Sequence, residues 1–598
     1  MKRNILVILF LALAFPLWGG PVGAERASEA ARAFFQRDRN VALRLAPIQR
    51  VERAAVPLTK ASQAEPAFHI FNRAGGGFVI IAADDACNPI LAYSFTNRFG
   101  LGPDMPEGLS AWLDDLEEQV AMAREASEAE RQQALPKWEA VFVRTKAGED
   151  GYKPAVKYET PVWGQNEPFN DLAPVINGKK AVAGCVPLAM SMLARFYQYP
   201  AAGTGTMPGY TYTTDANTSQ SINGYTLGDP YQWDKIKMSY QEAYTQDEAA
   251  AVAQLVYDCG VMVQAKFDSS TSANTFTMAG MAIEYLGYDP GAIGYYRGFY
   301  TDEQWLSMLK KELQEHPVLY SARRDGGGHS FLLDGYDERD FLSVNWGWSG
   351  DSNGYYALSA FTPKPERQYV LRHGAVFGLK PNAGGNPVEY LYLYTGTSSS
   401  GETFNGLEPK GEIVPRHTFH MKVGGICNGG NMPFEGQFIL ALTDADGKIK
   451  DFVCGSQYYD ATNPHSWRGY SDVSCILNTY PAPGDEIRGF FRSLLWEEND
   501  WRPLAYDATA GTVGAIPVYD NQTLAEATDF TYNKSVKMVT VNTKDRVTWS
   551  LKSSTGAEVK DGVTYSGVQL VIDSSTLKGA YTLTLKRDGD QCTLTLKF

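Results

Sequence analysis

Short hydrophobic runs separated by polar and glycine positions mark the first part of the chain. Residues 68–71 and 78–81 are rich in residues that favour β-structure, and glycines at 75–77 stand between them. This arrangement predicts two strands joined by a tight hairpin turn. Residues 89–93, a second mostly apolar run, predict a further strand next to them.

A helical pattern follows these strands. Residues 109–135 are charged and alanine-rich, with leucines at helical spacing, so they predict one helix that Pro136 ends. Together with the strands, this helix predicts a small α+β unit over residues 25–150. The charged, glycine-containing segment 144–157 is expected to be an exposed linker, where proteolysis concentrates.

The remaining sequence divides at a run of chain-breaking residues. Residues 151–382 mix helical and strand patterns and are rich in aromatic residues and glycine, and the run 380–387 predicts a boundary. Residues 383–527 carry short β runs between turn residues and predict a β-rich domain. From 528 to 598 the alternation is regular and predicts a small β-sandwich. A chain of 598 residues exceeds one hydrophobic core, so several domains are expected.

The N-terminus has the pattern of an export signal. Lys2 and Arg3 precede an apolar run at 5–18, and small residues follow at 22–24. We therefore predict a signal peptide over residues 1–24 and a secreted or cell-surface protein. A buried N-terminal helix is the alternative. The run is short and no second apolar stretch of about 18 residues follows, so no transmembrane helix is expected.

Charge and cysteine usage narrow the classes of partner. The net charge of −14 disfavours nucleic acid, because an acidic chain is repelled by phosphate. The seven cysteines are sparse and lack close metal-ligand spacing, so neither metal nor cofactor is expected. Cys427, Cys454 and Cys475 could include a disulfide, which the sequence alone does not pair.

Cys185 is the foremost candidate for chemistry. Gly184 permits an unusual backbone turn before it, and Pro187 suits the first turn of a helix after it. Apolar residues at 190, 193, 194 and 197 share one face of that helix. Cys185 is therefore expected at a helix N-terminus, where the dipole favours the nucleophilic thiolate. A structural cysteine at a helix start is the alternative.

His329 is the candidate partner of this cysteine. It follows glycines at 326–328 and opens the apolar strand predicted at 331–333. A thiol nucleophile needs a neighbour that takes and later returns a proton, and histidine does so most often. His329 lies 144 positions after Cys185, within the roughly 130–150 typical of papain-type cysteine enzymes. A loop histidine without a role is the alternative.

Two amides complete the candidate site. Asn345 follows His329 by 16 positions, about one hairpin, and could orient the imidazole while a neighbouring tryptophan keeps the bond dry. Gln165 precedes Cys185 by 20 positions and could, with the backbone N–H of Cys185, receive the oxyanion formed at a carbonyl. The alternatives are an aromatic core strand for Asn345 and a surface turn for Gln165.

Together these segments resemble the streptopain family of bacterial cysteine proteases. The resemblance extends over about residues 157–377 and rests on four motifs, W-G-Q-x-x-P-F-N from 163, G-C-V-x-x-A-M from 184, G-G-G-H-S-F-L-L-D-G-Y-D from 326 and V-N-W-G-W-S-G from 344, followed by N-G-Y-Y. Segments 77–85, 90–94 and 109–113 resemble the propeptide of that family.

The resemblance implies a papain-like fold in an α+β chain, peptide-bond hydrolysis through an acyl-enzyme, and protein or peptide substrates. It also implies a propeptide that inhibits its own enzyme and is cut away in the 144–157 linker. The implied roles are Cys185 as nucleophile, His329 as base and then acid, Gln165 as oxyanion donor, Asn345 or Trp346 as the group orienting His329, and Gly328 and Trp348 as substrate contacts. Departures from the family pattern are Val186-Pro187-Leu188, where relatives carry small residues, and Ser330, where alanine is common.

Three other interpretations compete with this one. A non-catalytic surface binding protein on a decayed protease scaffold would usually have lost Cys185 or His329, and both are present. A transglutaminase or amidase would usually carry aspartate where Asn345 stands. A free-standing inhibitor made of the N-terminal unit would end near residue 140.

Overall fold

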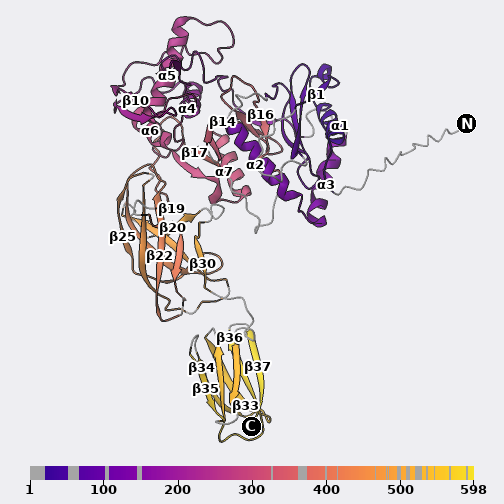
Figure 1. Cartoon of the computed structure of the whole chain (residues 1–598), viewed down its shortest axis with the longest axis vertical. Coiled ribbons are helices and arrows are strands. Elements are labelled where there is room, and N and C mark those ends of the chain that lie inside the picture. Colours follow the sequence, from indigo (N-terminus) through magenta and orange to yellow (C-terminus); the bar gives the residue numbers. More distant parts are fainter. Residues whose placement is uncertain are drawn as a thin grey trace, which may run out of the picture. The chain divides into compact units, whose positions relative to one another are not determined.

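The computed structural model (Figure 1) divides into two compact units, residues 1–388 and 389–598. The structure describes residues 20–598 except 52–65, 101–106, 144–150, 325–326, 361–372, 398–400, 412, 414, 465, 480, 483, 495–499, 507–511, 519–527, 534–536, 544–545, 565–567 and 588–589. Most of the predicted signal segment and half of the predicted linker therefore lie outside the described residues.

One large sheet organises the first unit. Its strand order is β1-β2-β3-β4-β16-β15-β14-β13-β17-β12, and β5 pairs with β14. The strands are β1 (Ile48–Val51), β2 (Phe68–Arg73), β3 (Phe78–Ala82), β4 (Ile90–Ser94), β5 (Pro154–Lys157), β12 (Ile293–Tyr296), β13 (Val318–Arg324), β14 (Gly327–Asp337), β15 (Leu342–Asn345), β16 (Gly354–Tyr356) and β17 (His373–Phe377). The N-terminal strands join the rest where β4 pairs with β16, with Tyr93 opposite Tyr355.

The predicted N-terminal hairpin is confirmed, since β2 and β3 pair antiparallel around the glycine turn. The single helix predicted over 109–135 is wrong, because two helices form, α2 (Glu107–Ala123) and α3 (Glu128–Phe142). Ser127 starts α3 with a capping box, in which its N–H donates to the Glu130 carboxylate at 2.7 Å. Pro136 lies inside α3 and does not end it.

Two hydrophobic cores lie on opposite faces of this sheet. Along β14, Phe331 and Leu333 belong to the core shared with α2, whereas Leu332 belongs to the core shared with α4. This alternation is the period of two that a strand imposes. The other helices of the unit are α1 (Ala24–Phe35), α4 (Cys185–Tyr197), α5 (Gln246–Met262), α6 (Thr277–Leu286) and α7 (Asp302–Leu313), with 3₁₀ turns at Val41–Leu43 and Arg297–Phe299.

Three short hairpins lie on the side of this unit that contains α4. They are formed by β6 (Val175–Ile176) with β7 (Lys179–Lys180), β8 (Thr206–Met207) with β11 (Tyr225–Thr226), and β9 (Tyr210–Thr213) with β10 (Ser219–Ile222). Tyr210 and Tyr212 of β9 donate to the carbonyls of Ala265 and Phe267, each at 2.8 Å, which ties this hairpin to the segment after α5.

The second unit is built of β-strands, as predicted. In its first part, one sheet runs β21-β22-β18-β29 with β26 on β22, and the other runs β24-β23-β27-β28 with β25 and β30 attached. The strands are β18 (Leu391–Leu393), β19 (Thr395–Thr397), β20 (Thr403–Asn405), β21 (Leu407–Lys410), β22 (Thr418–Asn428), β23 (Phe434–Thr443), β24 (Ile449–Phe452), β25 (Gln457–Thr462), β26 (Trp467–Ile476), β27 (Glu486–Ser493), β28 (Arg502–Pro503), β29 (Ala505–Tyr506) and β30 (Ala515–Pro517). Both sheets contribute to one core, Met421 from the first and Leu440 from the second.

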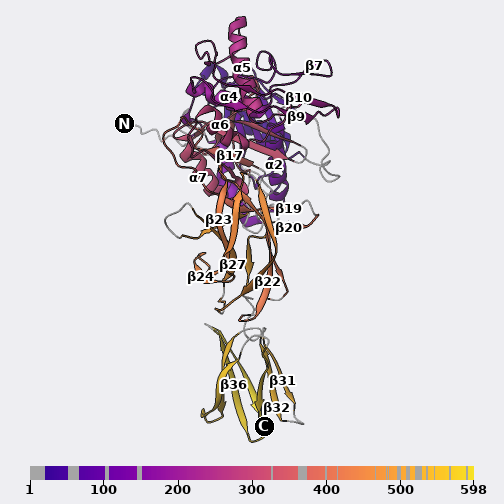
Figure 2. The ribbon, with the colours of Figure 1, turned by 90° about the vertical axis from the view of Figure 1, so that its left-hand side faces the viewer.

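The last part of the chain also forms two sheets around its own core (Figure 2). One sheet runs β31-β32-β35 and the other β34-β33-β36-β37, and Val541 and Leu583 meet between them. The strands are β31 (Thr528–Asn533), β32 (Met538–Thr543), β33 (Val547–Ser553), β34 (Glu558–Thr564), β35 (Leu570–Asp573), β36 (Ala580–Arg587) and β37 (Asp590–Lys597). Among the described residues, no helix has the length and apolar content needed to cross a membrane.

Candidate active site

Cys185 is the first residue of α4, as predicted. Gly184 before it has a φ of 93°, and a Cβ there would lie 2.6 Å from Cγ2 of Thr271. Only glycine meets both demands, so this turn into the helix requires it. Cys185 is half-buried, whereas the other six cysteines are buried. Its position at the start of α4 exposes the sulfur to the positive end of the helix dipole, which favours the thiolate.

The segment that carries Gln165 lies beside the approach to Cys185. The Ala183 N–H donates to the Gln165 carbonyl at 2.9 Å, two residues before the cysteine. On its other side, the Ser349 N–H donates to the Trp163 carbonyl at 2.7 Å. The structure thus brings together three segments that the sequence placed far apart, and the Gln165 side chain is half-buried among them.

His329 lies on β14, and 5% of its surface is exposed. Its Nε2 is 3.0 Å from the Trp346 carbonyl oxygen. A carbonyl oxygen only accepts, so Nε2 carries the hydrogen and Nδ1 is the nitrogen that can accept a proton. The β14–β15 hairpin, in which Leu332 pairs with Asn345, delivers the Trp346 carbonyl to this place.

Asn345 directs its buried side chain away from this bond. Its Nδ2 donates to Thr160 Oγ1 at 3.0 Å and to the Pro161 carbonyl at 2.8 Å. Its Oδ1 accepts from the Gly347 N–H and from Asn353 Nδ2, each at 3.2 Å. These four bonds hold the turn that presents the Trp346 carbonyl. The sequence pointed to the Asn345 amide as a partner of the imidazole; a backbone carbonyl leaves no such signal in a sequence.

The two tryptophans of this turn lie in different surroundings. Trp346 is fully buried, and its ring centroid is 4.5 Å from that of Phe331. Trp348 is partly buried, and a Cβ on Gly100 would lie 3.4 Å from its ring. Gly347 between them has a φ of 68°, and a Cβ there would lie 3.0 Å from Leu188 of α4. The turn therefore lies directly on the helix that begins at Cys185, and Gly328 is half-exposed beside His329.

A series of hydrogen-bonded side chains, which the sequence did not predict, supports Asn345. Asp334 is buried and accepts hydrogen bonds from Lys157 Nζ and from Thr160 Oγ1, the latter at 2.8 Å. Thr160 in turn accepts from Asn345, so a continuous path runs from Lys157 to the turn. A cavity of about 740 Å³ adjoins these side chains and is closed on another side by residues 96–98 of the N-terminal unit.

Helix α2 of the N-terminal unit packs on the strand that carries His329. Trp112 is buried, with its ring centroid 5.9 Å from Trp346 and 6.2 Å from Phe331. Its Nε1 donates to the Ala357 carbonyl at 3.2 Å. The Phe331 ring stacks in turn on His329 at 6.3 Å. The N-terminal unit thus contacts the immediate supports of the candidate base.

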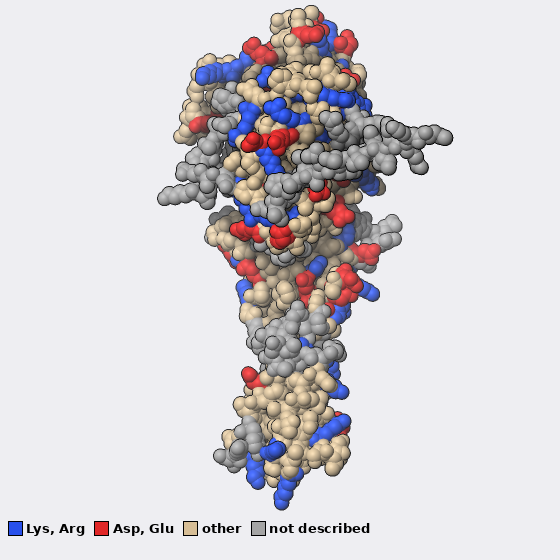
Figure 3. All heavy atoms as spheres, turned by 90° about the vertical axis from the view of Figure 1, so that its right-hand side faces the viewer, with Lys and Arg blue, Asp and Glu red and all other residues tan. Residues whose placement is uncertain are grey.

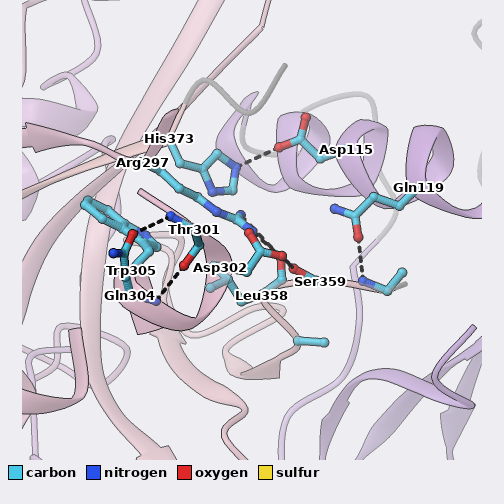
Figure 4. Close-up of polar contacts among 12 residues, drawn as sticks. Asp115, Gln119, Arg297, Thr301, Asp302, Gln304, Trp305, Leu358, Ser359 and His373 are labelled. Atoms are coloured by element: carbon cyan, nitrogen blue, oxygen red, sulfur yellow. Dashed lines mark hydrogen bonds and ion pairs between the residues drawn. The ribbon is translucent and has the colours of Figure 1, made fainter. Parts of the chain in front are cut away.

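Polar groups strengthen this contact (Figure 4). Asp115 of α2 pairs with His373 Nε2 at 2.7 Å, and His373 Nδ1 lies 3.0 Å from the Tyr320 hydroxyl. Gln119 accepts from the Ala360 N–H at 2.5 Å. Burial lowers the pKa of His373, although the bond to Asp115 acts in the opposite direction. His373 is therefore a neutral imidazole sealed beneath the helix at neutral pH.

An ion pair lies beside this imidazole. Arg297, almost fully buried, pairs with Asp302 at 2.8 Å and donates to the Ser359 hydroxyl at 3.1 Å. Burial raises the pKa of Asp302, but the charge of Arg297 and the bond from Ser359 outweigh it and hold this pKa below its ordinary value. This pair anchors residues 358–360, where α2 docks.

Among the described residues, no three His, Cys, Asp or Glu side chains gather as a metal site. On the face drawn in Figure 3, Lys and Arg side chains are interspersed with Asp and Glu. The absence of a nucleic-acid partner stays a prediction.

Comparison with known proteins identifies both halves of the first unit. Residues 163–356 match the Peptidase C10 family, and residues 19–120 match the Spi protease inhibitor family. The two matches support the predicted resemblance to the streptopain family. The matched domain is that of a cysteine endopeptidase. The predicted α+β unit followed by β-domains is confirmed by the helices and strands described above. The match with the Peptidase C10 family argues against a transglutaminase or an amidase.

Several relatives of the streptopain family are similar to this chain. A thiol protease/hemagglutinin, PrtT, of Porphyromonas gingivalis is 29% identical over 407 residues, which cover 65% of this chain but only 45% of that protein. Streptopain of Streptococcus pyogenes serotype M1 is 28% identical over 317 residues, covering 49% of this chain and 74% of streptopain.

Solved structures are also similar. A fragment of Prevotella intermedia prointerpain A covers 56% of this chain and 99% of its own, with 24% identity and a TM-score of 0.43. The structure of active interpain A from Prevotella intermedia covers 38% of this chain and 95% of its own, with 29% identity and a TM-score of 0.33.

Proposed function

We propose that this chain is an exported cysteine endopeptidase that is made as a zymogen. The observation that carries the proposal is the bond from His329 Nε2 to the Trp346 carbonyl, in a turn that lies on the helix headed by Cys185. This bond sets the tautomer in which Nδ1 accepts the proton of a thiol. A helix-terminal cysteine and a histidine poised as acceptor together make an activated nucleophile.

In the proposed reaction, the Cys185 thiolate attacks the carbonyl carbon of a peptide bond. The Gln165 side-chain amide and the Cys185 backbone N–H donate to the oxyanion. First-turn N–H groups have no carbonyl acceptor within their helix, which suits the backbone donor to this role. His329 then protonates the leaving amine, and the acyl-enzyme remains. Water, deprotonated by His329, hydrolyses the thioester and restores Cys185.

The remaining predicted residues receive supporting roles. Asn345 positions the Trp346 carbonyl through its four hydrogen bonds, and Trp346 fills the core beneath the imidazole. Gly328, half-exposed beside His329, and Trp348, on the outer side of the turn, are proposed to contact protein or peptide substrates. Nothing in these residues selects a particular substrate side chain.

Residues 25–150 are proposed to act as the inhibitory propeptide. The pairing of β4 with β16 and the packing of Trp112 tie this unit to the His329 side of the site. Cleavage in the 144–157 linker would separate the polypeptides but leave these contacts intact, so activation also requires the propeptide to leave. Its release would expose the edge of β16 and the surface over His373.

Export is proposed from the N-terminal signal pattern. The Val22 side chain is buried, its N–H donates to the Ala83 carbonyl at 2.8 Å, and the Gly20 N–H lies 3.1 Å from the Asp85 carboxylate. Removal of residues 1–24 would delete these contacts. We therefore place the processing site ahead of Gly20, so that residues 20–24 stay joined to residues 25–150 in the propeptide.

The test is to follow the purified full chain over hours at pH 6–8 with a reducing agent, beside Cys185→Ala. Wild type should lose about 120–130 residues and then digest a denatured protein, whereas the variant should do neither. If wild type stays intact, an added protease removes the propeptide before a second assay. Inactivity after that removal would reject the peptidase and favour a binding protein on a decayed scaffold.

A further inference from the structure

Two buried cysteines lie together in the first β-sandwich of the second unit. Cys475 is in β26, and Cys454 follows β24, which belongs to the facing sheet. The Ile476 N–H donates to the Val453 carbonyl at 2.8 Å, so the two cysteines are the chain neighbours of a hydrogen-bonded pair. Both side chains belong to the same hydrophobic core, with 8% of Cys454 and 2% of Cys475 exposed.

We infer that Cys454 and Cys475 form a disulfide that joins the two sheets of this sandwich. Val453 already bridges the sheets, since its own N–H donates to the Leu440 carbonyl of β23 at 2.8 Å. Because their chain neighbours Val453 and Ile476 are hydrogen-bonded to each other, the two cysteines lie next to each other across this contact, and closure needs little movement of the backbone. This inference concerns the accessory domain and stands whether or not the chain cleaves peptides.

The surroundings also activate one of the two sulfurs. The Leu440 N–H donates to Cys454 Sγ at 3.2 Å. The hydrogen bond from Cys475 and this backbone donor lower the pKa of Cys454, and the same contact raises the pKa of Cys475. By contrast, burial raises the pKa of Cys427, in the same domain, to about 11. Cys454 is thus the attacking thiolate of the pair and Cys475 the resolving thiol.

The chemistry requires a disulfide oxidant, such as glutathione disulfide or an envelope thiol oxidase. The Cys454 thiolate attacks one sulfur of the oxidant, which forms a mixed disulfide and releases one thiolate. Cys475 then loses its proton and attacks Cys454, and the second thiolate leaves. Two protein thiols give up two electrons and two protons, and two oxidant-derived thiols carry them away.

The test uses the full chain with Cys185→Ala, which prevents self-cleavage and removes the half-buried thiol. The protein is equilibrated with oxidised and reduced glutathione and then denatured in N-ethylmaleimide, which alkylates the free thiols. The number of adducts is read from the intact mass by mass spectrometry. Two fewer maleimide adducts than in the fully reduced sample are expected. Trypsin should then yield residues 451–468 linked to residues 469–488, because Lys450, Arg468 and Arg488 flank the two cysteines.

Matched variants then test the pairing. Oxidation should raise the melting temperature of the sandwich by on the order of 10 °C, given the loop that the bond closes. Cys475→Ser should abolish this difference between oxidised and reduced protein, and Cys427→Ser should retain it. A full set of maleimide adducts after oxidation, or a linked peptide containing Cys427, would overturn the inference.

Discussion

Helices α2 and α4 pack on opposite faces of β14, and they differ in how they hold it. Helix α4 and Leu332 share a hydrophobic core to which Leu188 and Met192 contribute. Helix α2 meets Phe331 with Trp112, but it adds Asp115 and Gln119, whose bonds reach β17 and residue 360. The contact proposed to be kept therefore rests on apolar side chains, whereas the contact proposed to be broken on activation adds a titratable His–carboxylate pair.

This difference has a physical reason. An apolar interface loses stability only when its surface returns to water, and its strength hardly depends on pH. A buried His–carboxylate contact depends on the protonation of both partners and is costly to leave half-made. Helix α2 thus holds tightly in the zymogen by a contact that a change of conditions can weaken, while α4 keeps Cys185 in place after the propeptide has gone.

The largest expected effect lies at the head of α4. Cys185→Ala should lower hydrolysis of a denatured protein by about 10⁴-fold or more, because the nucleophile is lost while the fold remains. Cys427→Ser, in the accessory domain, is the matched control and should keep wild-type activity. Equal activity in Cys185→Ala and in the control would mean that Cys185, at the start of α4, is not the nucleophile.

The next effect lies on the opposite face of β14. Trp112→Ala should weaken propeptide docking by about 3–5 kcal/mol, because it empties a fully buried site against Phe331 and Trp346. Self-processing on a gel should become faster, and the Cys185→Ala form of this variant should melt at a lower temperature. Unchanged processing together with an unchanged melting temperature would mean that α2 does not restrain the site.

A smaller effect is expected in the turn that lies on α4. Asn345→Ala should lower kcat by about 10- to 100-fold with KM nearly unchanged, since the Trp346 carbonyl loses its support and the His329 tautomer is no longer held. Thr160→Val removes one of the four Asn345 bonds, together with the bond from Thr160 to Asp334, and should cost only a few-fold. An equal loss in both variants would instead indicate general destabilisation of the turn.

The smallest effect is a pH dependence of stability that comes from the α2 contact. The folded pKa of His373 is lowered from about 6.5, so the unfolded chain binds more protons as the pH falls below that value. The Cys185→Ala zymogen should therefore lose stability below about pH 6.5 and gain none from His373 above it. Groups that face this imidazole are Asp115, Tyr320, Arg297 and Asp302.

His373→Gln should make the melting temperature fall less steeply between pH 7 and 5, whatever its level at pH 7. His69, whose pKa burial also lowers, supplies the control His69→Gln within the propeptide itself. If only the control changes the slope, the pH sensitivity belongs to the core of the propeptide and not to the α2 contact.

Much of the site could be predicted because its parts lie in local motifs. Each of these motifs spans only a few residues, so local backbone rules are enough to predict it. They are the glycine before Cys185, the apolar helix face after it and the glycine run before His329. The β-sandwich at the C-terminus was equally readable from its alternation. The helix predicted over 109–135 failed, because a capping box at Ser127 restarts the chain and a proline is tolerated within α3.

Residue types and short-range spacing are enough to indicate which chemistry the chain can carry and which local elements present it, because both depend only on near neighbours along the chain. The partner of His329 follows instead from long-range packing. A backbone carbonyl is the same at every residue, and the Trp346 carbonyl differs from the others because the turn on α4 brings it to the imidazole. The same holds for Asp115 with His373 and for Cys454 with Cys475, whose partners lie far apart along the chain. Sheet registers and the two faces of β14 bring them together, and such long-range geometry is set by the packing of the whole domain.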